Sequence, residues 1–312
     1  MRRCLQLASN GLLTAKPNPS VGAVIVDSDG IIIGEGFTSP VGGPHAEVNA
    51  FASVRRDDEA RLHDATIYVS LEPCSHWGHT PPCCDLIIRK GVRRCVCGCV
   101  DPFAKVRGRG IKRMREAGIE VTVGVMEDEC KDMNRRFMTF NEKRRPYITL
   151  KWAQTFNGFI SGEGGMPLRI SNEFTTMLSH KLRAESDAIL VGRGTLEADH
   201  PLLTTREWSG ASPERILLSH HADSTPEGFL RFGGIDEAIA HLYEEQKQSL
   251  IVEGGANVLR QFIDRDLWDE IRVETAPFTI PAGIVAPTLP RSTRLHGREE
   301  YDGNAICWYR HQ

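Results

Sequence analysis

The chain has 312 residues, of which 40% are hydrophobic and 25% are charged, and its net charge is −3. A length roughly twice that of a typical domain predicts two domains, each able to bury its own core. The acidic balance gives no basic footprint for nucleic acid, and no apolar run approaches the roughly 20 residues that a membrane helix needs. We therefore expect neither nucleic acid nor a membrane as a partner.

The N-terminus, MRRCLQLASNGLLTAKPNPS, lacks the sustained apolar stretch and the small-residue cleavage site of a secretion signal. We therefore expect a cytoplasmic protein in which the nine cysteines stay reduced. Clustered cysteines in that compartment are better explained by metal binding or catalysis than by disulfides.

The first half alternates strand-like and helix-like segments. Residues 21–37 predict a hairpin that turns at Asp29-Gly30. The segments expected after it are a helix at 45–54, a strand at 66–73, a helix at 83–91, a strand at 93–102, a helix and a strand within 108–125, and a charged helix at 127–145. This order predicts a three-layer α/β domain, in which helices cover both faces of a sheet.

A charged stretch that ends in NEKRRP (141–146) marks the expected boundary, with one domain at 1–143 and another at 144–312. The second domain opens with a strand that places Lys151 and its alternate neighbours on one face and Trp152 on the other. The later segments expected are strands at 187–192, 215–220, 249–255 and 269–277, and helices at 172–184, 234–246 and 256–264. Such alternation predicts a second α/β domain.

Two short segments, HAEVNA (45–50) and EPCSHWGHTPPCCD (72–85), are rich in metal-binding side chains. A catalytic zinc takes three protein ligands and keeps one position for water, and His45, Cys74 and Cys83 would supply the three. Glu47, two residues after the histidine, would be the carboxylate that moves protons beside the bound water. This arrangement is typical of zinc nucleobase deaminases.

The two adjacent cysteines have different expected roles. Cys83 follows two prolines at the expected first turn of a helix, where the helix dipole favours a thiolate. Cys84 would point about 100° away around that helix, so we interpret it as structural. The alternative to a zinc site is that His45 is a core histidine, which is the commoner role of a lone His-x-Glu. A second metal site at Cys95, Cys97 and Cys99, which share a strand face, is a weaker alternative.

Eight residues, SHWGHTPP, separate Cys74 from Cys83, which is longer than the Cys-x-x-Cys spacing of the short deaminase signature. His76 and His79 lie in this loop. Since zinc already has three ligands, these histidines either contact the substrate or only shape the loop, and both interpretations stay open.

The first half resembles the deaminase half of the RibD family of bifunctional riboflavin-biosynthesis proteins. The segments that carry the resemblance are PNPSVGAVIV (17–26), GGPHAEVNA (42–50), VSLEPCSHWGHTPPCCDLII (69–88) and DPFAKVRGRGIKRMREAGIEV (101–121). It implies a cytidine-deaminase-like fold and deamination of a phosphorylated diaminopyrimidinone. By position it assigns the zinc ligands and proton shuttle as above, and a pyrimidine contact to Asn18, which could also be a plain turn residue. Relatives carry Lys or Arg in place of His79, near the substrate phosphate.

The second half resembles the reductase of the same family, over YITLKWAQTFNG (147–158), LRAESDAILVGRGTLEADHPLLTTR (182–206) and SLIVEGGANVLRQFIDRDLWDEIRV (249–273). The resemblance implies a dihydrofolate-reductase-like α/β fold and NADPH-dependent reduction of the ribose to a ribityl chain. The positions that would face the substrate are Lys151, Arg183, Leu203, Arg206 and Glu253. The positions that would meet the cofactor are Ala153, Arg169, Gly192, Thr195, Asp199, Gly254 and Gly255.

The residues themselves agree with a nucleotide site. IVEGG leads from an apolar strand into a helix, and its two glycines let backbone N–H groups approach a phosphate. GxGxxG is absent, which disfavours an ordinary Rossmann domain. Arg183 and Arg206 suit phosphate because a guanidinium binds it through two hydrogen bonds, although a solvated surface charge is their plain alternative.

Several departures favour an alternative in which the second half is degenerate. Asn157 and Arg169 stand where relatives favour Asp and Trp, and the segment between RILLSH (215–220) and SLIVEGG (249–255) is short. A strand or loop missing there would affect the cofactor pocket. The second hypothesis is therefore a deaminase without reductase activity.

Two further hypotheses fit less well. A structural zinc site in a nucleic-acid-binding protein would need four protein ligands and would have no use for Glu47. A nucleic-acid-editing deaminase would have a basic face and the short cysteine spacing. We therefore expect a zinc- and NADPH-dependent enzyme that acts on a small phosphorylated pyrimidine, and we expect it to form a homo-oligomer.

Overall fold

The computed structural model describes residues 1–77, 81–103, 107–221 and 225–311. The chain divides into two compact units, Met1–Arg144 and Arg145–Gln312, which are described separately below. In the described residues, no helix is both long enough and apolar enough to cross a bilayer.

One five-stranded sheet forms the centre of the N-terminal unit. Its strands are β1 (Gly22–Val26), β2 (Ile32–Phe37), β3 (Thr66–Leu71), β4 (Arg94–Cys99) and β5 (Glu120–Val123). They lie in the order β2-β1-β3-β4-β5. Strand β1 is antiparallel to both of its neighbours, whereas β3, β4 and β5 run parallel. The predicted hairpin is confirmed: Gly30 turns it with φ of 82°.

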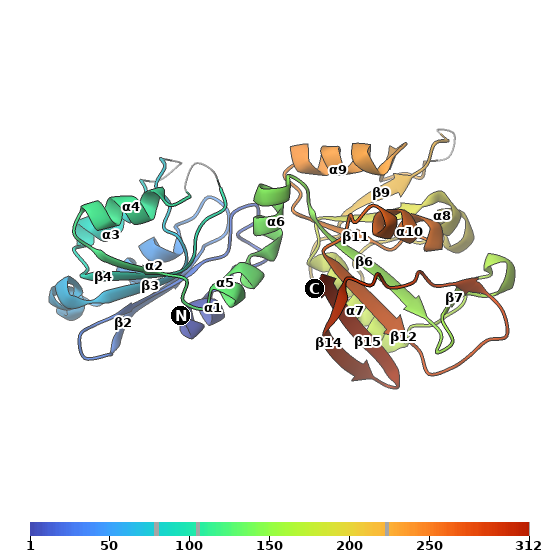
Figure 1. Cartoon of the computed structure of the whole chain (residues 1–312), viewed down its shortest axis with the longest axis horizontal. Helices are drawn as coiled ribbons and strands as arrows, with labels where there is room; N and C mark the ends of the chain where they lie inside the picture. The colour runs from blue at the N-terminus through green and yellow to red at the C-terminus, as the bar shows by residue number, and fades with distance from the viewer. Residues whose placement is uncertain (78–80, 104–106, 222–224, 312) are drawn as a thin grey trace. The chain divides into compact units, whose positions relative to one another are not determined.

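Helices cover both faces of this sheet, as the alternation of segments predicts. On one face lie α2 (Ala46–Ala52), α3 (Cys83–Lys90) and α4 (Arg109–Glu116), and on the other lie α1 (Arg2–Ser9) and α5 (Glu127–Met133) (Figure 1). A 3-10 helix, η1 (Arg56–Asp64), precedes β3, and α6 (Arg135–Lys143) ends the unit. The predicted three-layer arrangement is confirmed.

The single charged helix expected at 127–145 is wrong, because the segment forms α5 and α6 with a break at Asn134. The side chain of Asn134 is buried and bonds to the backbone of Ser20 in both directions. Ser20 N–H donates to Asn134 Oδ1 at 2.8 Å, and Asn134 Nδ2 donates to the Ser20 carbonyl at 2.9 Å. This pairing joins residues 114 apart in the sequence, so helical periodicity alone cannot reveal the break.

An eight-stranded sheet forms the centre of the C-terminal unit. Its strands are β6 (Tyr147–Gln154), β8 (Ala188–Gly192), β9 (Glu214–Leu218), β10 (Phe229–Phe232), β11 (Ser249–Val252), β12 (Glu270–Thr275), β14 (Thr293–Tyr301) and β15 (Asn304–His311). The order is β10-β9-β8-β11-β6-β12-β15-β14. The first six strands in this order are parallel, and β15 and β14 extend the sheet antiparallel.

Helices cover both faces of the second sheet as well. Helices α9 (Ile235–Glu244) and α10 (Ala256–Asp264) pack on the face that carries Leu150 and Trp152. Helix α7 (Glu173–Ala184) packs on the opposite face, where Leu182 joins a cluster that contains Ile251. The remaining elements are α8 (Arg193–Asp199), the 3-10 turn η2 (Glu163–Gly165) and a two-stranded sheet of β7 (Phe159–Ser161) and β13 (Ile284–Val285).

Candidate active sites

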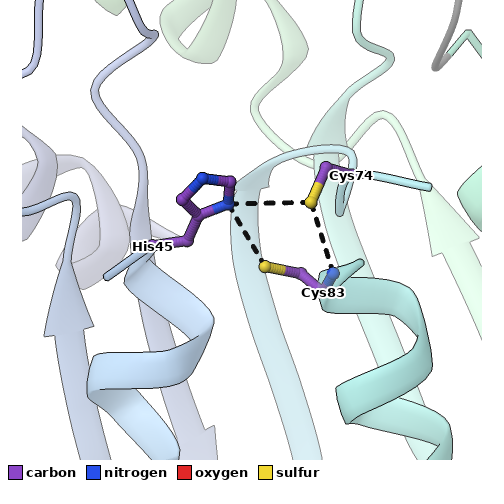
Figure 2. A group of neighbouring side chains, drawn as sticks. All are labelled: His45, Cys74 and Cys83. Atoms are coloured by element: carbon purple, nitrogen blue, oxygen red, sulfur yellow. Dashed lines mark hydrogen bonds between the residues drawn. The ribbon is translucent and has the colours of Figure 1, made fainter. Parts of the chain in front are cut away.

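The predicted zinc ligands come from three separate elements and meet at one point (Figure 2). His45 caps the N-terminus of α2, Cys74 follows β3, and Cys83 is the first residue of α3. The Nδ1 atom of His45 lies 3.3 Å from Cys83 Sγ and 3.6 Å from Cys74 Sγ. All three ligand atoms lie within 4.8 Å of one another.

This geometry fits a tetrahedral zinc ion. With bonds of about 2.3 Å to sulfur and about 2.0 Å to nitrogen, a tetrahedral site separates nitrogen from sulfur by about 3.5 Å. The two measured nitrogen–sulfur distances, 3.3 and 3.6 Å, bracket that value. Two thiolates and one imidazole also form a donor set that zinc prefers to magnesium or calcium. The three side chains can therefore hold a zinc ion and leave its fourth position for water.

The protein environment favours a thiolate at this site. The backbone N–H of Cys83, at the start of α3, donates to Cys74 Sγ at 3.2 Å. Hydrogen bonds from Cys83 and His45 hold the pKa of the Cys74 thiol well below its ordinary value. Unpaired N–H groups at a helix N-terminus act in the same direction. These contacts favour the thiolate form of Cys74, which is the form that binds a metal cation.

Glu47 lies in the first turn of α2, beside the ligands, and only 4% of its surface is exposed. Burial, together with the negative charge of Cys74, raises the pKa of its carboxyl to about 7. A carboxyl whose pKa is near neutrality can both accept and donate a proton. This is the property that the sequence predicts for a proton shuttle.

Glu72 supports the metal site, and our sequence analysis missed it. Its buried carboxylate accepts hydrogen bonds from the backbone N–H groups of Gly108 at 2.8 Å and of Gly110 at 3.1 Å, at the start of α4. A side chain at Gly110 would collide with the carbonyl of Pro73. The chain just before Cys74 is therefore fixed to α4. The sequence feature that could have identified Glu72 is a glutamate directly before Pro-Cys at the end of a buried strand.

The remaining cysteines lie apart from this site. Cys84 is buried and its Sγ lies 3.6 Å from Asp85 Oδ1, in agreement with a structural role. Cys95 and Cys97 face each other on β4 with their sulfurs 3.8 Å apart. Among the described residues, His45, Cys74 and Cys83 form the one group of three or more potential ligands that could hold a metal.

Two of the predicted substrate residues of the deaminase unit, Asn18 and His76, lie in loops. Asn18 is exposed in the loop after α1, and its backbone N–H donates to the carbonyl of Ala15 at 2.9 Å. The ring of His76 meets that of Phe103 edge to face, with centroids 6.0 Å apart. His79 lies outside the described residues.

In the C-terminal unit, a largely buried charge cluster contains three of the predicted substrate residues. Arg183 Nη2 donates to Glu253 Oε2 at 2.7 Å, and Lys151 Nζ lies 3.9 Å from Glu253 Oε1. Burial alone would raise the pKa of Glu253, but Lys151 and Arg183 overcome this and lower it to about 2. Burial also lowers the pKa of Lys151.

Two further charged residues on β12 belong to the same sheet face, and our sequence analysis missed them. Arg272 pairs in register with Lys151, and Glu274 pairs with Ala153. Arg272 is 1% exposed and lies over the Trp308 ring, at 5.4 Å from its centroid. Glu274 is fully buried and accepts a hydrogen bond from Asn304 at 2.6 Å. The sequence feature that could have identified Arg272 and Glu274 is the alternation of charged and apolar residues in the strand DEIRVETAP.

Leu203 and Arg206, the other predicted substrate residues, lie in the loop after α8. Leu203 is buried although its φ of 54° is unusual for a large side chain. The backbone N–H of Arg206 donates to Nδ1 of the buried His180 at 2.9 Å, and its side chain is exposed. The guanidinium donates to Thr204 Oγ1 at 2.8 Å.

Four of the predicted cofactor positions lie together at the carboxyl ends of β8 and β11. A Cβ added to Gly254 would lie 3.2 Å from the backbone nitrogen of Gly192, and one added to Gly255 would lie 3.0 Å from Thr195 Oγ1. Gly192 and Gly255 cap the N-termini of α8 and α10. Adjacent helix N-termini at the carboxyl edge of a parallel sheet are suited to bind phosphate.

The other three cofactor positions are more dispersed. Ala153 lies on β6, and Asp199 is the last residue of α8. Arg169 is exposed in the segment between η2 and α7. Burial raises the pKa of the Asp199 carboxyl.

Comparisons with known proteins cover both halves. Residues 1–99 match the cytidine and deoxycytidylate deaminase zinc-binding region, and residues 146–296 match the RibD C-terminal domain. The riboflavin biosynthesis protein RibD of Aquifex aeolicus is 35% identical over 91% of this chain and 88% of its own length. RibD of Corynebacterium ammoniagenes is 35% identical over 94% of this chain and 88% of its own length.

Among solved structures, the chain is similar to a Thermotoga maritima protein described as a diaminohydroxyphosphoribosylaminopyrimidine deaminase/5-amino-6-(5-phosphoribosylamino)uracil reductase. The two share 33% identity with a TM-score of 0.88, over 100% of this chain and 97% of the other. Acinetobacter baumannii RibD gives the same TM-score at 27% identity. The predicted fold class is confirmed. The likeness extends over the C-terminal half as well as the N-terminal half.

Proposed function

The chain belongs to the RibD family of riboflavin biosynthesis proteins, and we propose that its two units catalyse successive steps on one phosphorylated pyrimidine. It is an enzyme with both a deaminase and a reductase domain. The proposed substrate of the first step is 2,5-diamino-6-(5-phosphoribosylamino)pyrimidin-4(3H)-one. The observation that carries the deaminase proposal is the convergence of His45, Cys74 and Cys83 beside the buried carboxyl of Glu47.

In the deaminase unit, His45, Cys74 and Cys83 would hold zinc, which when bound activates a water molecule for attack on an amine-bearing ring carbon. Glu47 would take the proton of that water and deliver it to the departing amine, which leaves as ammonia. Asn18 and His76 would hold the pyrimidine.

In the reductase unit, the cofactor would supply a hydride and the protein would supply position and charge. Gly254 and Gly255 would let the cofactor phosphates approach the backbone at the start of α10, beside Gly192 and Thr195. The other cofactor contacts would come from Ala153, Arg169 and Asp199. The carboxyl edge of the sheet would bring that cofactor close to Lys151.

The reductase substrate would lie against Lys151, Arg183, Leu203, Arg206 and Glu253. Of the two arginines, Arg206 is the better phosphate ligand, since its side chain is exposed and its guanidinium donates to the uncharged hydroxyl of Thr204. The guanidinium of Arg183 already pairs with Glu253. Arg183 would therefore orient Glu253 toward the sugar.

The alternative, a deaminase with an inactive C-terminal unit, rests on the departures at Asn157 and Arg169. Asn157 makes structural contacts in this chain: its Nδ2 donates to the carbonyl of Ile280 at 2.8 Å. The eight-stranded sheet and the paired glycine sites support an active reductase instead. We also propose a cytoplasmic enzyme that forms a homo-oligomer and binds neither nucleic acid nor membranes.

The test is to incubate the purified full chain with the diaminopyrimidinone substrate, with and without NADPH. Ammonia release and NADPH oxidation are followed separately. Both signals are expected, and NADPH oxidation should depend on prior deamination. Ammonia without NADPH oxidation would support the alternative, and the absence of both signals would overturn the proposed substrate.

A further inference from the structure

A buried histidine connects two parts of the proposed reductase site. His180 lies on α7, is 2% exposed, and precedes Arg183 by three residues, so both side chains lie on one side of the helix. Its Nδ1 accepts the backbone N–H of Arg206 at 2.9 Å. The loop that carries Leu203 and Arg206 is therefore bonded directly to the helix that carries Arg183.

The hydrogen bond fixes the protonation state of the ring. Because Nδ1 accepts an N–H, it carries no proton, and the ring proton of the neutral imidazole lies on Nε2. Burial, together with the charges of Arg183 and Arg206, lowers the pKa of His180, which keeps the ring neutral. Glu207 lies 3.9 Å from Nε2, beyond hydrogen-bond distance.

The loop needs such an anchor because its backbone is strained. Leu203 has a φ of 54°, a conformation that large side chains rarely adopt, and its side chain packs in the cluster that contains Leu182 of α7. Strained backbone persists only where surrounding contacts hold it, and such sites are often functional. On the other side of the loop, Thr205 N–H donates to Ser212 Oγ at 3.0 Å.

We propose that His180 is a positioning residue of the reductase site, which holds the Arg206 main chain so that the guanidinium meets the phosphate of the substrate. This inference rests on the proposed reductase function and extends it to a residue that does not itself touch substrate. The competing interpretation is a core histidine that only stabilises the fold. The two interpretations predict different KM values for a variant in which His180 is substituted and the Arg206 side chain is already absent.

The test uses the full chain and two substitutions. His180→Leu removes the acceptor at similar volume, and His180→Asn keeps an acceptor oxygen near the position of Nδ1. We expect His180→Leu to raise the KM for the deaminated, phosphorylated substrate about tenfold, since the Arg206 N–H loses the partner that holds it in place. His180→Asn should restore most of that loss. In both variants kcat and ammonia release should stay near wild type.

A double-mutant cycle with Arg206→Ala identifies the route of the effect. If His180 acts through Arg206, the variant that carries both His180→Leu and Arg206→Ala has the same KM as Arg206→Ala alone. The matched control is His241→Leu, which removes a histidine on α9 that contacts Glu214 at 3.1 Å. The control should leave KM unchanged. Additive effects, or an equal rise in KM in the control, would overturn the proposal.

A binding measurement keeps the test independent of turnover. Calorimetry with ribose 5-phosphate gives a Kd for each variant. We expect His180→Leu to raise this Kd to a similar extent as Arg206→Ala. If the wild type oxidises no NADPH, the reductase proposal fails. The comparison of Kd values still tests whether His180 positions Arg206. Unchanged affinity in His180→Leu, with affinity lost in Arg206→Ala, would reject the positioning role.

Discussion

The guanidinium of Arg183 and the carboxylate of Glu253 form a largely buried ion pair, with 2.7 Å between Arg183 Nη2 and Glu253 Oε2. This contact joins α7 to the carboxyl end of β11. Because Lys151 lies on the other oxygen of the same carboxylate at 3.9 Å, one negative charge serves two cations. The sequence predicts Arg183 and Arg206 as phosphate ligands. Arg183 is already paired with a carboxylate, whereas the side chain of Arg206 is exposed, so substitutions of the two should have different effects.

The first prediction concerns Arg206. Arg206→Ala should raise the KM of the reductase for its phosphorylated substrate about tenfold, because a charge-assisted hydrogen bond to phosphate is lost. Stability should hardly change, since the side chain is exposed. Arg231→Ala on β10, which also removes a surface arginine, is the control. An unchanged KM in Arg206→Ala would mean that Arg206 is a solvated surface charge and not a phosphate ligand.

Arg183→Ala should act mainly on stability. Removing one partner of this largely buried pair leaves an uncompensated charge, which costs about 3 kcal/mol in the free energy of unfolding. Chemical denaturation of the full chain measures this loss. Adding Glu253→Gln to Arg183→Ala should recover part of it, because the unpaired charge is then absent. If the double variant is less stable than Arg183→Ala, the pair is not the source of the loss.

The third prediction is a pH dependence of stability. The pKa of Glu253 is about 2 in the folded protein, against an ordinary value of 4.5. A depressed carboxyl pKa contributes stability that is fully present above pH 4.5 and is lost as the pH falls toward 2. The contribution is on the order of 3 kcal/mol.

Denaturation curves measured from about pH 6 down to about pH 3 for wild type and Glu253→Gln test this dependence. The wild type should lose stability more steeply than the variant below the ordinary carboxyl pKa. The exposed Glu245→Gln is the control and should follow wild type. Parallel curves for wild type and Glu253→Gln would mean that Glu253 is not held ionised by its cations.

The fourth prediction separates proton transfer from metal binding. Glu47→Gln keeps the volume of the side chain but cannot accept a proton, so ammonia release should fall about 100-fold or more. Zinc content and NADPH oxidation with the deaminated substrate should stay at wild-type levels, because neither depends on Glu47. A variant that deaminates at a near-normal rate would remove Glu47 from the reaction.

The fifth prediction uses two adjacent cysteines as a matched pair. Cys83→Ser should lose zinc and deamination, since Cys83 Sγ faces His45 Nδ1 at 3.3 Å. Cys84→Ser should keep both, because its sulfur lies against Asp85. Metal analysis of the purified variants gives zinc per chain. Equal zinc loss in the two variants would contradict the ligand assignment.

The convergence of the three proposed zinc ligands could be predicted from the sequence because each has a local signal. His45 and Glu47 are two residues apart at a helix start, and Cys83 opens the next helix after two prolines. Helix starts and strand ends are visible in short windows of sequence. Most strands and helices of both units were predicted within a few residues for the same reason.

Contacts between distant segments could not be predicted in this way. Glu72 meets Gly108 across 36 residues, and Arg183 meets Glu253 across 70. The break at Asn134 also depends on a distant partner. The strands β14 and β15 were missed because their residues alternate weakly and most of β14 is exposed. Pairing with β12 stabilises β15, and the sequence of β15 alone does not show this.

The hydrogen bonds around Cys74 also bear on how the metal could be exchanged. The backbone N–H of Cys83 holds the Cys74 sulfur, and Glu72 anchors the chain just before it, so protein contacts alone bring the ligands together. An apo-enzyme of this kind should stay folded when a chelator strips its metal. Cobalt could then be loaded into the intact protein, where its visible absorption would report on the water-bearing position during turnover.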